Sequence, residues 1–190
     1  MIALTSQFDN LETPMTQTIA PPTPSASTAR WVVMGVCGCG KSTVGNALAR
    51  RFGVAFIEGD QFHPAANVEK MSAGVPLDDD DRAGWLQALA DQIRQARERN
   101  AGLVVSCSAL KRRYRDLLRQ ADPGLRFAHL HGPRELIAAR LGGRADHYMP
   151  PALLDSQLRD LEPLQRDEGG LALDIALPPG ELVERIAGQG

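Results

Sequence analysis

The segment from Gly35 to Ser42 constrains this chain more than any other part of its sequence. It runs Gly-Val-Cys-Gly-Cys-Gly-Lys-Ser and matches the pattern G-x-x-x-x-G-K-[ST] at every fixed position. A continuous apolar run over 31–34 precedes it, and apolar residues at helical spacing follow it over 42–52. This order of buried strand, glycine-rich loop and amphipathic helix predicts a loop that wraps around phosphate groups. The alternative, a glycine-rich turn that binds nothing, is disfavoured by this context.

The residue types of the loop suit the binding of a nucleoside triphosphate. Glycines let the backbone curl so that its N–H groups face an anion, and the helix that follows adds a positive dipole end. We expect Lys41 to reach the outer phosphates and to be catalytic, and the Ser42 hydroxyl to ligate Mg²⁺. The predicted nucleotide-binding residues of this segment are Gly35, Gly38, Gly40, Lys41, Ser42 and Thr43.

The remainder of the chain alternates between short apolar runs and longer segments of helical periodicity. The expected strands are 31–34, 54–58, 103–105, 127–130 and 171–177, and the expected helices are 42–52, 82–99, a segment around 136–140, 153–161 and 181–187. Strands separated by helical crossovers form a parallel sheet with helices on both faces. The fold class is therefore α/β, with the nucleotide loop after the first strand, as in P-loop NTPases.

The composition divides the 190 residues into a leader and one domain. Residues 1–29 contain no Lys or Arg and thirteen Pro, Ser or Thr, which predicts a disordered leader, and residues 30–190 suit a single domain. A signal peptide would need a basic start and an apolar run, and both are missing. The net charge of −2 disfavours a dedicated nucleic-acid binder, and no apolar stretch approaches the roughly 20 residues of a membrane span. A cytoplasmic protein is expected.

Two acids follow the second expected strand, Glu58 and Asp60. The carboxyl ends of parallel strands share one edge of the sheet, where open α/β folds bind their ligands. Asp60 could orient an acceptor hydroxyl and take its proton, and Glu58 could support Mg²⁺ through water. The alternative is a pair of solvated loop acids.

Cys37 and Cys39 form a Cys-x-Cys pair inside the loop. A helix N-terminus lowers the pKa of a thiol, so the pair could bind a metal or respond to oxidation and thereby block the nucleotide. The favoured alternative is that both are small residues whose backbone matters more than their sulfur.

Four segments carry a resemblance to the thermoresistant-type gluconokinases. Besides the loop, they are Glu-Gly-Asp-x-x-His-Pro-x-x-Asn-x-x-Lys-Met at 58–71, Pro-Leu-x-Asp-x-Asp-Arg-x-x-Trp-Leu at 76–86, and Cys-Ser-Ala-Leu-Lys-x-x-Tyr-Arg-Asp at 107–116. The resemblance covers most of residues 31–165. It implies an adenylate-kinase-like sheet of strand order 2-3-1-4-5, a homodimer, and transfer of the γ-phosphate of ATP to the 6-hydroxyl of D-gluconate in gluconate catabolism. The chain departs from the family in its loop cysteines and its leader.

Gluconate has a carboxylate at one end and hydroxyls along its length, so its site needs a fixed cation and several polar partners. Arg82, Lys111 and Arg115 can supply the cation, although Arg82 beside four acids could equally neutralise them. The predicted substrate-binding residues are Asp60, His63, Asn67, Lys70, Arg82, Ser108, Lys111 and Arg115. Arg112, Arg113 and Arg119 are expected on the solvated side of a helix, and Asp80 or Asp81 as the cap of the helix that carries Trp85.

Arg140 and Arg144 flank Gly142-Gly143, which predicts a small mobile lid that brings positive charge onto the phosphates. We expect Arg140 to bind nucleotide and Arg144 to be catalytic; ordinary surface arginines are the alternative. Asp174 to Pro178 could border the adenine.

Three other functions share parts of this pattern. A shikimate-kinase-like enzyme would be expected to carry a glycine-rich segment after the third strand, where this chain has Ser106-Cys107-Ser108-Ala109. A nucleoside monophosphate kinase would need a base-reading pocket, for which no motif is found. A nucleotide-binding switch without enzymatic activity also remains open.

Overall fold

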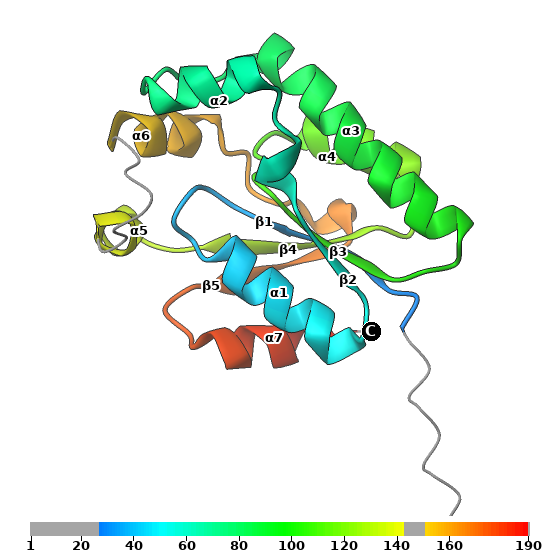
Figure 1. The fold of residues 1–190 in the computed structure, drawn as a ribbon. Coiled ribbons are helices and arrows are strands. Elements are labelled where there is room, and N and C mark those ends of the chain that lie inside the picture. Colours follow the sequence, from blue (N-terminus) through cyan, green and yellow to red (C-terminus); the bar gives the residue numbers. More distant parts are fainter. Residues whose placement is uncertain (1–26, 143–150, 190) are drawn as a thin grey trace, which may run out of the picture.

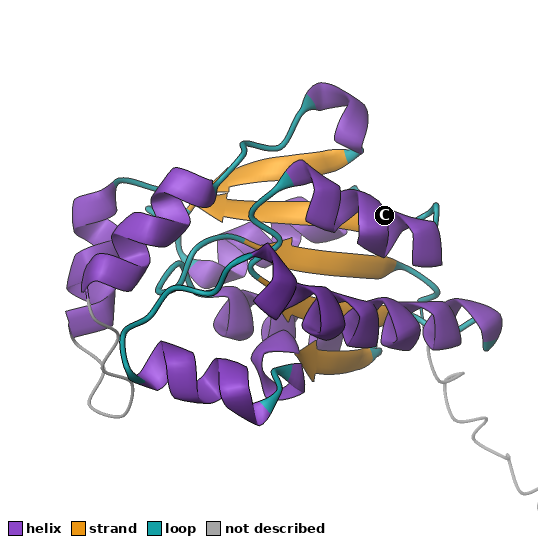
Figure 2. Ribbon diagram, turned by 90° about the horizontal axis from the view of Figure 1, so that it is seen from above, coloured by secondary structure: helices purple, strands orange, loops and turns teal. Residues whose placement is uncertain are grey.

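The computed structural model describes residues 27–142 and 151–189, and it contains one five-stranded parallel sheet. The strands are β1 (Arg30–Met34), β2 (Ala55–Glu58), β3 (Leu103–Cys107), β4 (Arg126–His131) and β5 (Gly170–Asp174). Their order in the sheet is β2-β3-β1-β4-β5, and every neighbouring pair is parallel (Figures 1 and 2). The predicted fold class and the strand order implied by the resemblance are confirmed.

Helices cover both faces of the sheet, as expected from the crossovers. The helices are α1 (Lys41–Phe52), α2 (Ala65–Ser72), α3 (Asp79–Glu98), α4 (Arg112–Ala121), α5 (Arg134–Gly142), α6 (Pro151–Asp160) and α7 (Pro179–Ala187), with short 3₁₀ turns at Gly59–Phe62 and Arg166–Glu168. Helices α1 and α7 pack together on one face, and α3 and α4 pack together on the other (Figure 1). No helix in the described part of the chain is long and apolar enough to cross a membrane.

Strand β1 is the centre of the sheet and is buried on both faces. Trp31 and Val33 join the core cluster under α1 and α7, and Val32 and Met34 join the cluster under α3 and α4. This alternation follows from the period-two geometry of a strand, and it explains why the run 31–34 is apolar at every position. A rigid strand at this place holds the glycine-rich loop that follows it.

Several element boundaries differ from the sequence prediction. Helix α3 begins at Asp79 because Asp78 caps it: its carboxylate accepts from the Asp81 N–H at 2.8 Å, while the Asp81 carboxylate accepts from the Asp78 N–H at 3.0 Å. The cap is therefore Asp78, and not Asp80 or Asp81. Strand β5 ends at Asp174 rather than 177, because the Asp174 carboxylate accepts from the Ala176 N–H and starts a turn.

The leader prediction falls mostly on residues 1–26, which lie outside the described residues. Residues 27–29, which we had assigned to the leader, lie against the domain: the Ser27 N–H donates to the Phe52 carbonyl at 3.3 Å, and the Leu103 N–H donates to the Ala29 carbonyl at 3.1 Å. The packed part of the chain thus begins at least three residues before Arg30.

Candidate active site

The glycine-rich loop connects β1 to α1 in a backbone shape that only glycine adopts without strain. Gly35 has φ 140° and Gly40 has φ 94°, and a Cβ on Gly35 would lie 2.4 Å from the Leu130 carbonyl oxygen. The Gly35 N–H donates to the Ser108 carbonyl at 3.3 Å, which joins the loop to the segment after β3. The Lys41 ammonium donates to the Val36 carbonyl at 3.0 Å, so the lysine folds back over the loop.

The acidic segment after β2 is held by a hydrogen-bonded clasp around Gly59. The Gly59 N–H donates to Ser106 Oγ at 3.2 Å, and its carbonyl accepts from Trp85 Nε1 at 2.8 Å. A Cβ on Gly59 would lie 2.1 Å from the Ser106 carbonyl oxygen, so no larger residue fits there. The backbone just before Asp60 is therefore held by hydrogen bonds at both its N–H and its carbonyl, and this fixes the position from which the Asp60 side chain extends.

Glu58 lies at the end of β2, as predicted, and its carboxylate is engaged within the protein. Its carboxylate accepts a hydrogen bond from the Ser106 hydroxyl, and it is not among the residues that line the pocket described next. Glu58 therefore belongs to the clasp that positions Asp60, and its support of Mg²⁺ through water stays a prediction.

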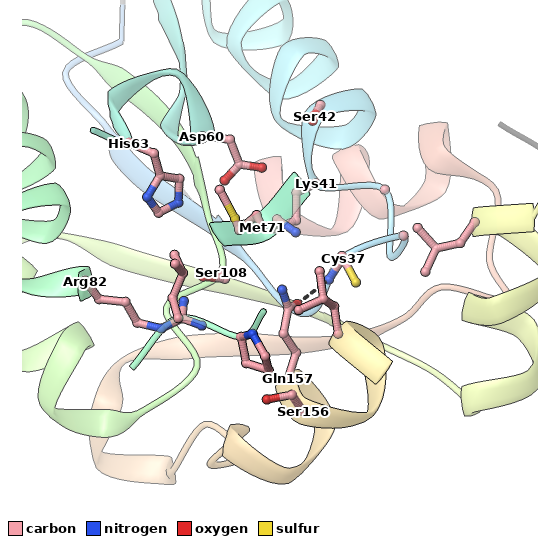
Figure 3. Close-up of a pocket in the computed structure, with 16 residues that line it drawn as sticks. Cys37, Lys41, Ser42, Asp60, His63, Met71, Arg82, Ser108, Ser156 and Gln157 are labelled. Carbon is pink, nitrogen blue, oxygen red and sulfur yellow. Dashed lines mark hydrogen bonds between the residues drawn. The ribbon is translucent and has the colours of Figure 1, made fainter. Parts of the chain in front are cut away.

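A central pocket opens between the glycine-rich loop, the segment after β2, the start of α3 and helix α6 (Figure 3). Asp60 and Lys41 face this space from two different strand ends, with His63, Arg82 and Ser108 around it (Figure 3). The lining residues are Cys37, Gly38, Gly40, Lys41, Ser42, Asp60, His63, Met71, Pro76, Leu77, Arg82, Ser108, Leu141, Leu153, Ser156 and Gln157. The fold thus brings together four of the predicted nucleotide-binding residues, Gly38, Gly40, Lys41 and Ser42, with five of the eight residues predicted to bind the acceptor. Asp60, His63, Arg82 and Ser108 line the pocket directly, and Asn67 is linked to it through His63.

Arg82 is a cation of this pocket and has no counter-ion among the described residues. Its side chain is 6% exposed, and among the described residues no carboxylate lies within 4.0 Å of its guanidinium. A buried guanidinium without a partner is costly, because a charge removed from water needs another charge or several hydrogen bonds. Its placement favours capture of an anion from solution over the alternative that it neutralises the acids beside it.

The other predicted cations are occupied by carboxylates of the chain itself. Lys70 pairs with Asp81 at 2.5 Å, and Lys111 pairs with Asp79 at 3.0 Å. Tyr114 and Arg113 also donate to Asp79, and these hydrogen bonds hold the pKa of its carboxyl well below the usual range. Neither Lys70 nor Lys111 lines the central pocket, so the structure gives them a role in holding α3 against its neighbours.

Arg115 is completely buried and has a structural role, contrary to the prediction that it binds substrate. Its Nε and Nη2 donate to the Glu168 carboxylate at 2.6 and 2.8 Å, and its Nη1 donates to the carbonyls of Ala109, Leu110 and Glu162 at 3.1 Å. All three guanidinium nitrogens are engaged. The prediction from residue type was wrong for Arg115, because residue type alone does not distinguish a buried structural arginine from one that binds a ligand.

The Arg115–Glu168 pair predicts an acid-sensitive component of stability. Burial alone would raise the pKa of Glu168, but the hydrogen bonds from Arg115 lower it to about 2, below its ordinary value of 4.5. Because the pKa is lower in the folded state, the ionised Glu168 contributes its full share to the free energy of unfolding above about pH 4.5. This share is lost as the pH falls toward 2. Glu168→Gln is expected to lower the free energy of unfolding by about 3 kcal/mol at pH 7, because it leaves a buried guanidinium unpaired.

Urea unfolding at pH 7, 4 and 3 tests this, with Asp167→Asn as the matched control. Asp167 pairs with Arg112 on the surface, where an ion pair contributes about 0 to 1 kcal/mol. Equal losses of unfolding free energy in the two variants would contradict the stabilising role of the Arg115–Glu168 pair. So would a Glu168→Gln protein whose stability falls with pH as much as that of the parent.

A second pocket borders the glycine-rich loop and contains two more of the predicted nucleotide-binding residues, while Gly35 lines neither pocket. Thr43 and Arg140 line it together with loop residues 38–40 and the apolar side chains of Leu177 and Leu182. The Arg140 guanidinium donates to the Ile175 carbonyl at 2.7 Å. Of the segment 174–178 that could border the adenine, Leu177 lines this pocket.

Helix α6 supplies residues that the sequence analysis missed. The Gln157 side-chain oxygen accepts from the Cys37 N–H at 2.7 Å, so α6 contacts the glycine-rich loop directly (Figure 3). Ser156 and Leu153 also line the pocket, and Met71, Pro76 and Leu77 close it from the side of α2. Met71, Pro76 and Leu77 stand in the motif segments of the sequence, whereas no spacing marks Leu153, Ser156 or Gln157. Arg144, predicted to act from a lid, lies outside the described residues.

The three cysteines are buried, and burial raises the pKa of each thiol: to about 11 for Cys37, to about 12 for Cys107, and upward for Cys39. The thiol of Cys37 therefore does not have the lowered pKa that a helix N-terminus was expected to produce. Within the described residues no group of three or more His, Cys, Asp or Glu could hold a metal. The structure favours the interpretation in which both loop cysteines act as small residues.

We expect the folded protein to resist thiol reagents. The thiolate is the reactive form, and a rise in pKa of about two units or more lowers its population about 100-fold. Labelling with a thiol-reactive disulfide at pH 8 should be slowed by at least this factor relative to the urea-unfolded chain, and mild peroxide should leave nucleotide binding unchanged. Rapid labelling of a single cysteine with loss of nucleotide binding would contradict this expectation.

Comparison with known proteins agrees with this geometry. The family model for shikimate kinase matches residues 37–168. The chain is 46% identical to the gluconokinase of Gluconobacter oxydans (strain 621H) over 155 residues, which is 82% of this chain and 87% of the relative. It is 43% identical to the thermoresistant gluconokinase of Escherichia coli (strain K12) over 149 residues, covering 78% and 85% of the two chains.

A solved structure shows the same likeness. The crystal structure of a gluconokinase from Sinorhizobium meliloti 1021 superposes with a TM-score of 0.78 at 46% identity, covering 85% of this chain and 91% of that one. The chain therefore belongs to the gluconokinase family, within the wider group of P-loop kinases that the shikimate kinase model describes.

Proposed function

We propose that this protein is a gluconokinase, which transfers the γ-phosphate of ATP to the 6-hydroxyl of D-gluconate and yields 6-phospho-D-gluconate and ADP. The observation that carries the proposal is that Arg82, a buried guanidinium with no ion-pair partner among the described residues, lines the same pocket as Lys41 and Asp60. A sugar acid offers a carboxylate to Arg82 and a hydroxyl to Asp60. The gluconokinase relatives support this choice of acceptor.

The proposed roles follow from where the side chains lie. Arg82 binds the carboxylate of gluconate with a charge-assisted hydrogen bond, and His63 and Ser108 hold hydroxyls along the chain. Asp60 orients the 6-hydroxyl and takes its proton as the oxygen attacks the γ-phosphorus. Lys41 and the loop N–H groups stabilise the charge that spreads over the transferred phosphoryl group.

Mg²⁺ is proposed as the metal that accompanies ATP. Ser42 offers a hydroxyl oxygen in the central pocket close in sequence to Lys41, and Asp60 offers a carboxylate there. Magnesium binds hard oxygen ligands and usually keeps several waters and substrate phosphates, so a site with few protein ligands fits it. When bound, the ion would neutralise phosphate charge; Ser42 would hold it directly and Asp60 through water.

A coupled assay for ADP release tests the function with D-gluconate, shikimate and AMP as acceptors in the presence of ATP and Mg²⁺. Shikimate is included because the matching family model bears that name. We expect turnover with gluconate and at least 100-fold lower kcat/KM with the other two, because an acceptor that leaves Arg82 or a pocket hydrogen bond unpaired loses binding energy. Turnover with shikimate, or ATP binding with no acceptor phosphorylated, would refute the proposal in favour of a shikimate kinase or a switch.

The homodimer and the lid remain predictions drawn from the family resemblance and from the sequence around Arg144. Light scattering coupled to size-exclusion chromatography measures the molar mass in solution and so tests the homodimer. If the lid acts as predicted, Arg144→Ala should lower kcat far more than it weakens nucleotide binding.

A further inference from the structure

Two described residues of the central pocket carry side chains of the kind that serve as general bases, Asp60 and His63. Either could in principle take the proton of an attacking hydroxyl. Cys37 also lines the pocket, but burial raises the pKa of its thiol to about 11, so it stays protonated. Which of the two acts as the base depends on which nitrogen of the His63 ring carries its proton.

The His63 ring is held in place by contacts on its face and its edge. It stacks on the Trp85 indole with the ring centroids 4.3 Å apart and the planes 17° from parallel. Trp85 is itself fixed by its hydrogen bond to the Gly59 carbonyl at 2.8 Å. On its edge, His63 Nδ1 lies 3.3 Å from the side-chain nitrogen of Asn67. The ring therefore presents one nitrogen to Asn67 and has the other left for the pocket that it lines.

The identity of the Asn67 atom is determined by a second contact. Asn67 is 4% exposed, and its Nδ2 lies 2.7 Å from the backbone carbonyl oxygen of Asp81. A carbonyl oxygen only accepts, so the atom that contacts it must be the NH₂ group and not the amide oxygen. The same NH₂ group has one hydrogen for Asp81 and one for His63, and an amide nitrogen cannot accept. His63 Nδ1 is therefore the acceptor.

We infer that Asn67 is a positioning residue that keeps the His63 ring protonated on Nε2, so that His63 donates a hydrogen bond to the acceptor substrate and Asp60 alone serves as the base. The identity of the substrate rests on the proposed function, whereas the tautomer does not. The opposite tautomer would place two donors face to face at 3.3 Å in a partly buried site, where an unmatched donor is unfavourable.

The charge state of the ring agrees with this assignment. Burial lowers the pKa of His63 below its ordinary value of 6.5; the Asp60 carboxylate opposes this shift and the Arg82 guanidinium adds to it. The ring is thus neutral at pH 7, and its pocket nitrogen already carries a hydrogen. In the transfer step the O–H bond of the substrate breaks and its proton moves to the Asp60 carboxylate. The substrate oxygen forms a bond to the γ-phosphorus as the bond from that phosphorus to the bridging oxygen breaks, and ADP leaves.

Nitrogen NMR of the ligand-free protein tests the tautomer without any reference to activity. The chain has four histidines, so a ¹⁵N-histidine sample gives few signals, and His63→Gln identifies the signal of His63. We expect the pattern of a neutral ring with its hydrogen on Nε2 at pH 7. A signal from a ring protonated on Nδ1, or on both nitrogens, would overturn the inference.

Two variants of Asn67 show whether it sets the tautomer. Asn67→Asp replaces the donor by an acceptor, so the ring should move its hydrogen to Nδ1 or become doubly protonated, with its pKa raised by about one unit or more. Asn67→Ala, which adds no charge beside Asp81, should give a mixture of the two neutral tautomers. An unchanged Nε2–H signal in either folded variant would contradict the role of Asn67.

Kinetics separates the donor role of His63 from a role as base. Glutamine can place an amide N–H near the position of Nε2 but cannot accept a proton, so His63→Gln should keep at least tenfold more kcat than His63→Ala. A His63→Gln enzyme no more active than His63→Ala would overturn the donor role. If gluconate is not phosphorylated at all, the proposed function fails, while the NMR result still decides the tautomer.

Discussion

Replacing Asp60 with asparagine is expected to lower kcat for gluconate phosphorylation by about 10² to 10⁴, the usual contribution of a positioned general base. Asparagine has nearly the same shape and keeps a hydrogen-bonding oxygen, so the clasp around Gly59 that fixes the backbone should persist. Binding of ATP, which depends on the glycine-rich loop and Lys41, should change little. The loss should therefore appear in kcat, because the carboxylate acts as the proton leaves the substrate.

Steady-state kinetics with gluconate and titration with a fluorescent ATP analogue measure the two effects separately. Asp80→Asn is the matched control, since Asp80 is exposed near the start of α3 and does not line the central pocket. An Asp60→Asn enzyme with the turnover of the parent would refute Asp60 as the base. A loss of ATP binding as large as the loss of kcat would indicate that Asp60 acts mainly through the nucleotide and its metal.

Replacing Arg82 with glutamine is expected to raise the KM for gluconate by about 30- to 1000-fold, which corresponds to about 2 to 4 kcal/mol. Removal of one partner from a buried, hydrogen-bonded charge pair costs about 2 to 5 kcal/mol, and Arg82 is 6% exposed with no carboxylate of the described chain beside it. The KM for ATP should move much less. The apo protein should not lose stability and could gain some, because the unpaired buried charge disappears.

Arg97→Gln provides the comparison, because Arg97 lies on the same helix and is exposed. The kinetic constants for both substrates and the unfolding free energy of both variants are the measurements. An unchanged KM for gluconate in Arg82→Gln would remove the observation on which the proposed function depends. A large loss of stability in that variant would show that Arg82 is bound within the protein and not available to a ligand.

Much of the fold follows from local sequence patterns. The run over 31–34 is apolar at each position, and the structure buries it on both faces of β1. The helices α1 and α3 carry apolar residues at helical spacing, and both form with their buried positions toward the sheet. Helix α2 was not predicted, since its eight residues have little apolar periodicity and its buried residue is the polar Asn67. Its place depends on the hydrogen bonds of Asn67 and Lys70 to Asp81 of α3, and these polar contacts leave no periodicity in the sequence.

Residue types and spacings were sufficient to determine the chemistry of the loop and the presence of an acid at the neighbouring strand end. The pattern Gly35 to Ser42 and Asp60 after β2 depend on local backbone geometry and on the shared edge of a parallel sheet, which apply to any chain of this class. The family likeness then identified a set of polar residues, but it assigned Arg82, Lys111 and Arg115 the same role.

Only the tertiary structure separated these three cations. Arg115 reaches Glu168 across 53 residues of sequence, Lys111 reaches Asp79 across 32, and Arg82 meets no carboxylate in the described chain. Ion pairing is a matter of atoms within about 4 Å, and that proximity is created by packing between elements distant in sequence. The sequence by itself determined which chemical groups this protein possesses, and the folded structure decided which of them remain available to a substrate.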